Sequence, residues 1–328
     1  MKMFIRPFGK YGSVLLCLML MACARVPEVD TSVTECTVPP QGRASAMCFA
    51  LGDTVYIVGG RLEDNSYSST MMTFCPASSQ WQNNITTPLT ARVNGVATCT
   101  AEAVYMGLGF AKGSIYKDET HLNDWWRFEP EGRKWKRLAD FPSRKTVSAI
   151  AFANEQYVWV GFGFNGFGDE LWRYSIAADQ WEAVPHQDVW PERLMSPVAA
   201  TCSGRIYQGT GFRHRGRTDW WEFFPDDQHW EKRASLPYEG RHNAACAATT
   251  EAVWVMGGWH YGDSLTDGYH FADILRYTPA TNDWTRCGTM PCGVTENGVA
   301  CAIGHRLYFG LGESDKSVLH LNWYCIEE

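Results

Sequence analysis

The chain has 328 residues, of which 45% are hydrophobic and 14% aromatic, and its formal net charge is −7. This length fits one large all-β domain or two average domains. The acidic balance argues against general nucleic-acid binding, which needs a basic footprint. Fifteen tryptophans and thirty glycines indicate many short strands joined by tight turns.

The first 22 residues have the organisation of a secretory signal, in which basic residues precede an apolar core at 14–21 that is too short for an ordinary membrane span. The core ends in Leu20-Met21-Ala22-Cys23, which resembles the lipobox of bacterial lipoproteins. The resemblance implies that Cys23 is lipidated and begins the mature chain. The alternative is an ordinary cleaved signal followed by an incidental cysteine. We therefore expect a signal over 1–22 and a tether over 23–32.

Acyl chains on Cys23 would hold the protein at a membrane, because several chains anchor firmly where one binds only marginally. We expect a location in the bacterial cell envelope, at the outer membrane. Residues 24–26 carry no acidic cluster that would indicate export to the surface. The sequence therefore leaves the periplasmic and the surface orientation open.

The rest of the chain repeats one pattern, an aromatic residue seven positions before a tryptophan. The pairs are Phe74/Trp81, Phe128/Trp135, Tyr174/Trp181, Phe223/Trp230 and Tyr277/Trp284. The interval is about 50 residues, which places a sixth unit near Tyr324, and glycine pairs such as Gly257-Gly258 mark the same interval. Each unit reads as four short strands. Six such units predict a β-propeller, because radial closure leaves only short, protected sheet edges.

The double glycine, the aromatic residue and the tryptophan at this spacing resemble kelch repeats over residues 33–328. The sequence of the glycine-containing segments also resembles kelch-type lipoproteins of Bacteroidetes. The resemblance implies an all-β, six-bladed propeller, which we expect to be monomeric. The sixth unit ends before any tryptophan strand. Residues 33–39 align with residues 284–290, so we expect an N-terminal strand to pair into the C-terminal blade and close the ring.

Cysteines recur at one position in the first strand of five blades, where small apolar residues otherwise stand. They are Cys48, Cys99, Cys202, Cys246 and Cys301. We expect them to pack as small hydrophobes rather than bind metal, because first strands should diverge beyond bridging distance around a channel. The alignment of the closing strand puts Leu321 rather than Cys325 opposite Cys36, which disfavours a disulfide there.

Arginine recurs just before the first strands, on the face where kelch propellers also place the loops between second and third strands. The recurring residues are Arg43, Arg92, Arg144, Arg193 and Arg241, with Thr295 in the sixth blade. The loops add Arg61, Arg213, Arg215, Trp259, His260 and Tyr261. Guanidinium groups bind carboxylates in bidentate geometry and aromatic rings stack on sugars, so this face could bind an anionic ligand.

A structural role for these arginines is the competing interpretation. Each could pair with an acid of the next blade, such as Glu313, Asp263 or Asp169, and lock the blades together. The aspartates just before third strands are interpreted as turn formers. They are Asp124, Asp169, Asp219 and Asp273.

An enzymatic function is the alternative, because Arg217-Thr218-Asp219 resembles the arginine-bearing loop of bacterial sialic-acid mutarotases. That resemblance implies an arginine and a nearby acid as catalytic groups. Phe212 stands where the acid is expected, which leaves Arg217 and Glu313 as weak catalytic candidates. Only His260 and His270 share a loop, which disfavours a copper site, and no phosphate loop, nucleophile elbow or zinc spacing occurs.

These patterns favour a non-catalytic, lipid-anchored binding module of the cell envelope, with a protein partner or an anionic glycan as ligand. We expect no nucleic acid, metal or cofactor. The alternative is a periplasmic isomerase that acts on an anionic sugar.

Overall fold

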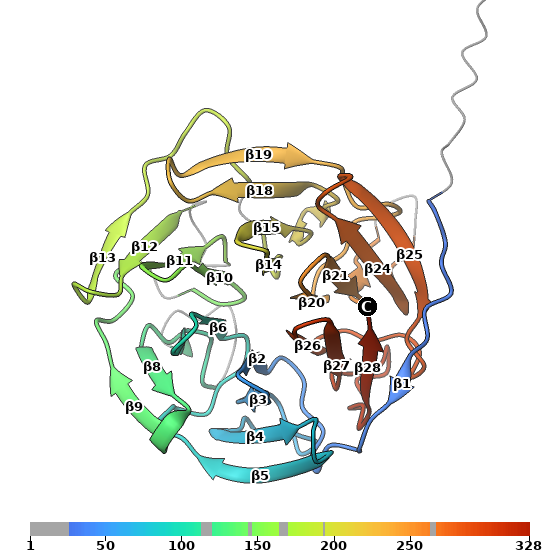
Figure 1. Cartoon of the computed structure of the whole chain (residues 1–328), viewed down its shortest axis with the longest axis horizontal. Helices are drawn as coiled ribbons and strands as arrows, with labels where there is room; N and C mark the ends of the chain where they lie inside the picture. Colours follow the sequence, from blue (N-terminus) through green and yellow to red (C-terminus); the bar gives the residue numbers. More distant parts are fainter. Residues whose placement is uncertain (1–25, 113–119, 144–145, 164–169, 193, 263–266) are drawn as a thin grey trace, which may run out of the picture.

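A computed structural model describes residues 26–112, 120–143, 146–163, 170–192, 194–262 and 267–328. These residues form six four-stranded antiparallel sheets, arranged radially as the blades of one ring (Figure 1). The all-β, six-bladed architecture predicted from the repeat is thus confirmed. In the described part of the chain, no helix is long and apolar enough to cross a membrane.

Each blade runs from the centre of the ring outward in strand order (Figure 1). Blade 1 comprises β2 (Met47–Leu51), β3 (Thr54–Val58), β4 (Thr70–Cys75) and β5 (Gln80–Thr86). Blade 2 comprises β6 (Val96–Cys99), β7 (Val104–Gly107), β8 (Trp125–Glu129) and β9 (Lys134–Arg137), with the short 3-10 helix η2 (Glu131–Arg133). Blade 3 comprises β10 (Ile150–Ala153), β11 (Tyr157–Gly161), β12 (Leu171–Ser175) and β13 (Gln180–Ala183). Blade 4 comprises β14 (Val198–Cys202), β15 (Arg205–Gly209), β18 (Trp220–Phe224) and β19 (His229–Arg233). Blade 5 comprises β20 (Ala245–Ala248), β21 (Val253–Met256), β24 (Asp273–Thr278) and β25 (Asp283–Thr289). Blade 6 comprises β26 (Val299–Ile303), β27 (Arg306–Gly310), β28 (Trp323–Glu327) and β1 (Thr34–Glu35).

Each repeated aromatic residue lies directly across a hairpin from its tryptophan. Tyr277 pairs with Trp284 and their ring centroids are 5.2 Å apart, and the other four pairs match in the same way. In two of these blades the indole N–H reaches the preceding blade: Trp284 Nε1 donates to the Ala234 carbonyl at 2.8 Å and Trp181 Nε1 to that of Ala139 at 2.9 Å. The seven-residue spacing therefore builds both a hairpin and a contact between blades.

The ring closes through β1, the outermost strand of the sixth sheet. Thr34 pairs with Cys325, and Trp81 Nε1 of blade 1 donates to the Thr37 carbonyl at 2.8 Å. This bond repeats the indole contact seen between other blades. The predicted closure by an N-terminal strand is therefore confirmed.

The register of the closing strand differs by two residues from the prediction. The Cys36 N–H donates to the Trp323 carbonyl at 2.8 Å, so Cys36 does not lie opposite Leu321. Continuing the observed register places Val33 opposite Ile326, and both pack in one apolar cluster. The shift arises because Ile326, and not Tyr324, occupies the aromatic position of the sixth repeat.

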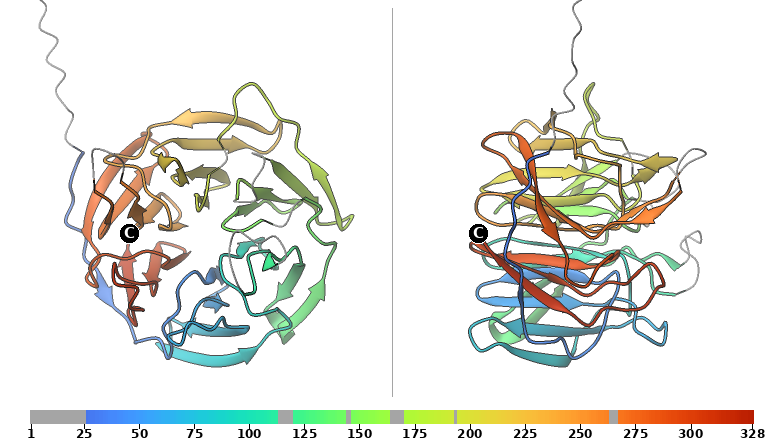
Figure 2. Two further views of the ribbon diagram at one scale, coloured as in Figure 1. Left: turned by 180° about the vertical axis from the view of Figure 1, so that it is seen from behind. Right: turned by 90° about the vertical axis from the view of Figure 1, so that its right-hand side faces the viewer.

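The N-terminal segment contacts the ring before β1. Val29 N donates to the Arg286 carbonyl and Arg286 N to the Pro27 carbonyl, at 2.9 and 2.8 Å, and the Arg286 guanidinium pairs with Glu28. Figure 2 shows this segment running along the outer edge of β25 before it reaches blade 6. Residues 27–29 of the predicted tether are thus held against blade 5.

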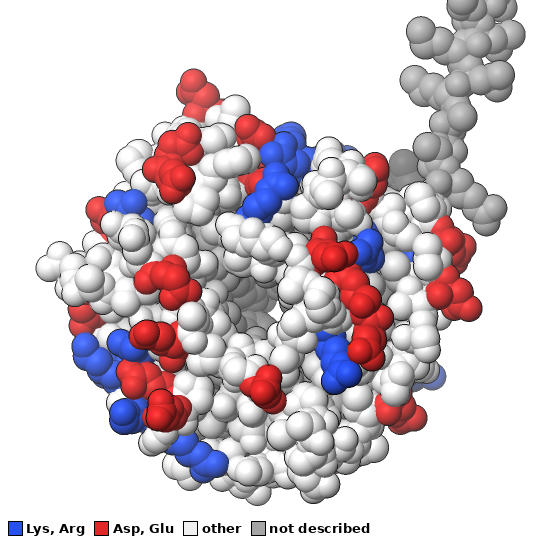
Figure 3. Space-filling model, in the orientation of Figure 1, with Lys and Arg blue, Asp and Glu red and all other residues white. Residues whose placement is uncertain are grey.

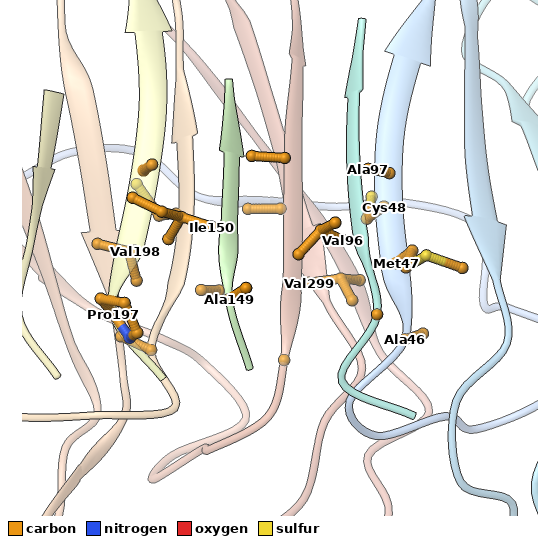
Figure 4. A pocket seen from close by; sticks show the side chains of 18 residues that line it. Ala46, Met47, Cys48, Val96, Ala97, Ala149, Ile150, Pro197, Val198 and Val299 are labelled. Atoms are coloured by element: carbon orange, nitrogen blue, oxygen red, sulfur yellow. The ribbon is translucent and has the colours of Figure 1, made fainter. Parts of the chain in front are cut away.

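First strands surround a channel lined mostly by small side chains, with a volume of about 180 Å³. Figure 4 shows Ala46, Cys48, Ala97 and Ala149 among these side chains. Burial raises the pKa of Cys99 to about 12, which keeps this first-strand thiol protonated. The recurring cysteines thus occupy small, largely apolar positions.

Candidate functional site

The loops that lead into first strands and the loops between second and third strands lie on one face of the ring, which we call the mouth (Figure 2, left). Isolated bridges join these loops into short rows above the blades. The rows are Ala44–Arg61–Tyr67, Val93–Phe110–His121, Met195–Phe212, His242–Trp259 and Glu296–Glu313–Leu319. Titratable groups gather over blades 5, 6 and 1, whereas the rows over blades 2 and 4 are largely apolar.

Six residues with positive φ surround the channel at the mouth. They are Ser45, Asn94, Ser148, Ser196, Asn243 and Asn297. Backbone hydrogen bonds link neighbours around this ring, for example Ser45 N to Asn297 O at 2.9 Å and Asn297 N to Asn243 O at 2.9 Å. The left-handed conformation explains why small residues and Asn occupy these six positions, since they tolerate it best. This ring fixes the positions of the residues on either side of it.

Two of the recurring arginines form buried ion pairs inside their own blades. Arg92 binds both carboxylate oxygens of Asp124 at 2.7 and 2.6 Å. Arg241 binds Asp273 in the same bidentate way at 2.5 and 3.0 Å, and its guanidinium lies 3.6 Å from the ring centroid of Phe271. Both guanidinium groups are buried, so an external carboxylate does not reach them.

Arg43 is buried without a carboxylate partner. Its guanidinium donates to the carbonyls of Gly59 and Thr70 at 2.9 and 2.7 Å and to the Thr70 hydroxyl at 2.8 Å. Burial lowers the pKa of Arg43 to about 10. The side chain therefore clamps the start of β4.

The recurring arginines connect neighbouring blades through their carbonyls and not through their side chains. Gly60 N of blade 1 donates to the Arg92 carbonyl of blade 2 at 2.8 Å, and Gly211 N of blade 4 donates to that of Arg241 in blade 5 at 2.7 Å. The expected pairing of these arginines with acids of the next blade is therefore wrong for Arg92 and Arg241. Their partners are the aspartates that the sequence interpreted only as turn formers.

The described members of the predicted arginine ring do not form a ligand-binding surface. Arg43, Arg92 and Arg241 are buried, and each donates hydrogen bonds within its own blade. Arg144 and Arg193 lie outside the described residues. In blades 1, 2 and 5 the recurring arginine lies two residues before the residue of positive φ. In blades 3 and 4 that position is occupied by Thr146 and Leu194. The sequence alignment of these two loops was therefore shifted.

A polar row crosses the mouth from blade 5 to blade 1; its members are His270, Asn243, Glu296, Glu313, Asn297 and Arg61. Glu296 accepts hydrogen bonds from His270 Nε2 at 3.1 Å and Asn243 Nδ2 at 2.9 Å. Glu313, directly across the bridge from Glu296, accepts from Asn297 Nδ2 at 3.1 Å and pairs with Arg61. Two carboxylates thus lie side by side, each held by its own donors.

Aromatic rings form a continuous shelf beside this row; we call Phe212, His242, Trp259, Tyr261 and His270 the aromatic shelf. Ring centroids are 4.9 Å apart for Phe212 and Tyr261 and 5.3 Å for Trp259 and Tyr261. His270 stacks on Trp259 at 5.6 Å with an interplanar angle of 8°. Tyr261 is 54% exposed. The shelf therefore offers a ring surface next to hydrogen-bonding groups.

His242 is the buried member of the aromatic shelf, with 2% of its surface exposed. Its ring contacts Phe212 and Trp259 at centroid distances of 5.3 and 5.1 Å. Burial lowers the pKa of His242 to about 4, partly opposed by the charge of Glu296. The imidazole is therefore neutral near pH 7, and its buried Nδ1 has no hydrogen-bond partner among the described residues.

A short hairpin of β16 (Phe212–Arg213) and β17 (Arg215–Gly216) brings positive charge to the shelf. Arg213 and Arg215 are exposed on either side of the turn, and Arg213 Nη1 lies 4.0 Å from Glu192. Glu192 is engaged more closely by Arg217 at 2.5 Å. This cationic hairpin keeps part of the predicted basic face exposed, whereas Arg61 is paired with Glu313.

The two weak catalytic candidates do not come together. Arg217 pairs with Glu192, whereas Glu313 pairs with Arg61 at the junction of blades 6 and 1. The structure instead brings together His270 and Glu296, which the sequence did not combine. Glu296 follows Thr295 by one residue, as His242 follows Arg241. Aligning the loops on the residues of positive φ would have found this position.

The described residues contain no metal site, and the face opposite the mouth carries exposed acids. No group of three or more His, Cys, Asp or Glu among the described residues could hold a metal ion. Figure 3 views the face opposite the mouth, where acidic side chains are spaced around the central opening. The exposed acids in turns between first and second strands are Asp53, Glu102, Glu155 and Glu251. This face does not favour anionic ligands.

Comparison with known proteins places this site on a familiar scaffold. A model of the kelch motif matches residues 240–291, which include most of blade 5. The solved structure of YjhT superposes with a TM-score of 0.74 and 14% identity, covering 89% of this chain and 97% of that one. These likenesses support the six-bladed kelch propeller fold.

Curated relatives are distant. N-acetylneuraminate epimerase of Yersinia enterocolitica is 24% identical over 57% of this chain, and that of Yersinia pestis (strain Pestoides F) is 23% identical over 67%. Kelch-like protein 35 of Mus musculus is 25% identical over 63%. The matches cover 43%, 51% and 35% of those proteins, so the chain spans about half or less of the curated relatives it matches.

Proposed function

We propose that the protein is a non-catalytic binding module for an acidic glycan, which it binds at the mouth. The observation that carries this proposal is the aromatic shelf, flanked on one side by the polar row and on the other by the cationic hairpin. Sugar rings stack on aromatic faces, and amide and carboxylate groups hydrogen-bond their hydroxyls. An acidic substituent would lie toward Arg213 and Arg215, the exposed arginines of the cationic hairpin.

In this site the aromatic rings and the charged hairpin have different roles. Tyr261 and Trp259 provide ring surface that any pyranose could cover, so they contribute affinity with little selectivity. The cationic hairpin distinguishes acidic from neutral sugars, and its contribution falls as salt is added because exposed charges are screened. Arg43, Arg92 and Arg241 take no part in this proposal, since their side chains are buried inside the blades.

A glycan array with matched acidic and neutral members tests this function. We expect binding of acidic glycans by the wild type, loss of binding in Trp259→Ala, and loss of the acidic preference in Arg213→Ala/Arg215→Ala. Phe224→Ala is the control, because this ring stacks on His229 at the end of β18, away from the mouth. Equal array profiles for wild type and Trp259→Ala would contradict the proposal, and protein pull-down then becomes the test of a protein partner.

An isomerase of anionic sugars is the second candidate, and the His270–Glu296 pair favours it. Glu296 holds Nε2 of His270 at 3.1 Å, so Nδ1 is the ring nitrogen that this pair does not use. An imidazole oriented by a carboxylate can remove the proton of an anomeric hydroxyl and return a proton to the ring oxygen. The distant similarity to N-acetylneuraminate epimerases agrees with this chemistry. NMR of anomer interconversion tests it, and a rate equal to the spontaneous one in the presence of wild type would contradict it.

We further propose that Cys23 carries the lipid anchor and that the protein resides at the outer membrane of a bacterial envelope. The support is the resemblance of residues 20–23 to a lipobox. Mass spectrometry of the mature N-terminus tests this, with acylated Cys23 as the expected result. An unmodified N-terminus created by cleavage elsewhere would contradict it.

A further inference from the structure

The junction that closes the ring places two cysteines on the same face of the sixth blade. Thr34 lies opposite Cys325, and Cys36 follows Thr34 by two residues and donates its N–H to the Trp323 carbonyl at 2.8 Å. Residues two apart in a strand point to the same side. Cys36 and Cys325 are therefore diagonal neighbours, and both pack in the apolar cluster that joins blades 6 and 1.

We infer that Cys36 and Cys325 form a disulfide that covalently closes the propeller when the protein meets an oxidising thiol–disulfide couple. Such a bond would replace the weakest connection of the ring. β1 has only two residues and both are exposed, so few backbone hydrogen bonds hold the N-terminal strand in the sixth blade. The bond would join the two ends of the whole fold, since the chain between Cys36 and Cys325 forms all six blades.

The two thiols influence each other's ionisation. Their interaction raises the pKa of Cys36 and lowers that of Cys325, and the Tyr308 hydroxyl lowers the pKa of Cys325 further. Cys325 is thus the thiol that ionises first and attacks. Diagonal Cα atoms on antiparallel strands are about 7 Å apart, the upper limit for a disulfide, so bonding requires a small shift of the short edge strand β1.

The reaction balances as an exchange with an external disulfide. The Cys325 thiolate attacks one sulfur of a disulfide R–S–S–R, such as oxidised glutathione or the active disulfide of an oxidoreductase, and releases one thiolate R–S⁻. The Cys36 thiolate then attacks the mixed disulfide at Cys325 and releases the second. Two protein thiols are oxidised, one external disulfide is reduced to two thiols, and the protons from Cys36 and Cys325 pass to solvent or to the released thiolates.

A second pair of thiols shows what distinguishes the junction. Cys48 and Cys301 of neighbouring first strands also interact, and this interaction adds to the raised pKa of Cys301. Complete burial raises the pKa of Cys301 well above the ordinary value. Because Cys301 is buried and carries little thiolate, this pair should stay reduced in the folded protein.

Oxidation of the full chain by glutathione tests the inference. After treatment with oxidised glutathione, acid quench and alkylation, peptide mapping should show Cys36 linked to Cys325 and a mass lower by two hydrogen atoms. The linked protein should have a Tm higher by roughly 5–10 °C than the reduced protein, because the bond closes a very long loop. Cys36→Ser should abolish both changes, whereas Cys75→Ser should abolish neither.

Cys75 also reports whether the oxidant acts, because the Ser78 hydroxyl and N–H lower the pKa of this thiol. A glutathione adduct on Cys75 together with fully alkylated Cys36 and Cys325 would overturn the inference. A link between Cys48 and Cys301 in place of Cys36–Cys325 would overturn it as well. Both outcomes are independent of glycan binding, which is measured at the mouth.

Discussion

Arg92 and Asp124 form a bidentate ion pair inside the second blade, with N–O distances of 2.7 and 2.6 Å and the arginine almost fully buried. The pair connects the loop before β6 to the start of β8. Arg241 and Asp273 repeat it in blade 5. The most conspicuous basic positions of the sequence therefore stabilise individual blades.

Replacing Asp124 by Ala should lower the free energy of unfolding by about 3–5 kcal/mol, because it leaves the Arg92 guanidinium buried without its counter-ion. Urea denaturation measures the change. Asp140→Ala removes the exposed partner of Arg137 and should cost about 1 kcal/mol or less. Similar losses in the two variants would contradict a stabilising role for the buried pair.

The stability of the protein should decrease as the pH falls from about 6.5 to about 4, through His242. Its pKa is about 4 in the folded state, where burial opposes the charge, and near 6.5 when unfolded, so the unfolded chain binds a proton first. The loss attributable to this residue is about 3 kcal/mol and levels off below pH 4.

His242→Phe keeps a planar ring between Phe212 and Trp259 and removes the titration. Urea midpoints measured from pH 7 to 4 should therefore fall less steeply in this variant than in the wild type. His229→Gln is the control, because the neighbouring Asp227 raises the pKa of this exposed histidine. If His242→Phe showed the wild-type slope, another group would be responsible.

Gly258→Ala should destabilise the protein much more than Gly288→Ala. Both glycines have positive φ, 96° and 93°. A Cβ at Gly258 would lie 2.8 Å from the His242 carbonyl oxygen, whereas none of the surrounding atoms is within 4 Å at Gly288. We expect a loss of about 1–2 kcal/mol at Gly288 from backbone strain and at least twice that at Gly258. Equal losses, measured by urea denaturation, would show that the close approach is relieved without cost.

Removing residues 1–39 should lower the Tm by on the order of 10 °C, because the deletion opens the ring. The shortened chain lacks β1 and the Thr37 carbonyl that accepts from Trp81. A chain starting at residue 31 is the control, since it loses the contacts of residues 27–29 with Arg286 and keeps β1. Scanning calorimetry should rank the deletion of β1 as far more destabilising, and equal Tm values would contradict closure through β1.

The repeat predicted the architecture because the aromatic residue and the tryptophan that define it both pack within the blades. Tyr277 and Trp284 lie seven apart because they face each other across a hairpin, and this relation is local in the chain. The sixth blade was harder to predict, because Ile326 replaces the aromatic residue and its partner strand comes from the other terminus. The same substitution explains why the predicted register of the closing strand at Cys36 was wrong by two residues.

The site was less predictable than the fold, because its residues are combined from different blades. His242 contacts Phe212 of blade 4, and Glu296 of blade 6 binds His270 of blade 5. The sequence identified Trp259 and Tyr261 from their loop, but a single arginine motif does not reveal whether a guanidinium points to solvent or to an aspartate. That choice depends on Asp124 and Asp273, 32 residues further along in each blade.

Isothermal titration with an acidic glycan identified on the array tests the central claim most directly. The wild type and Phe224→Ala should bind with equal affinity, and Trp259→Ala should bind at least roughly tenfold more weakly, because a central stacking residue dominates such a site. Circular dichroism and the Tm of each variant show that the ring is intact. Unchanged affinity in a folded Trp259→Ala variant would contradict a glycan site on the aromatic shelf.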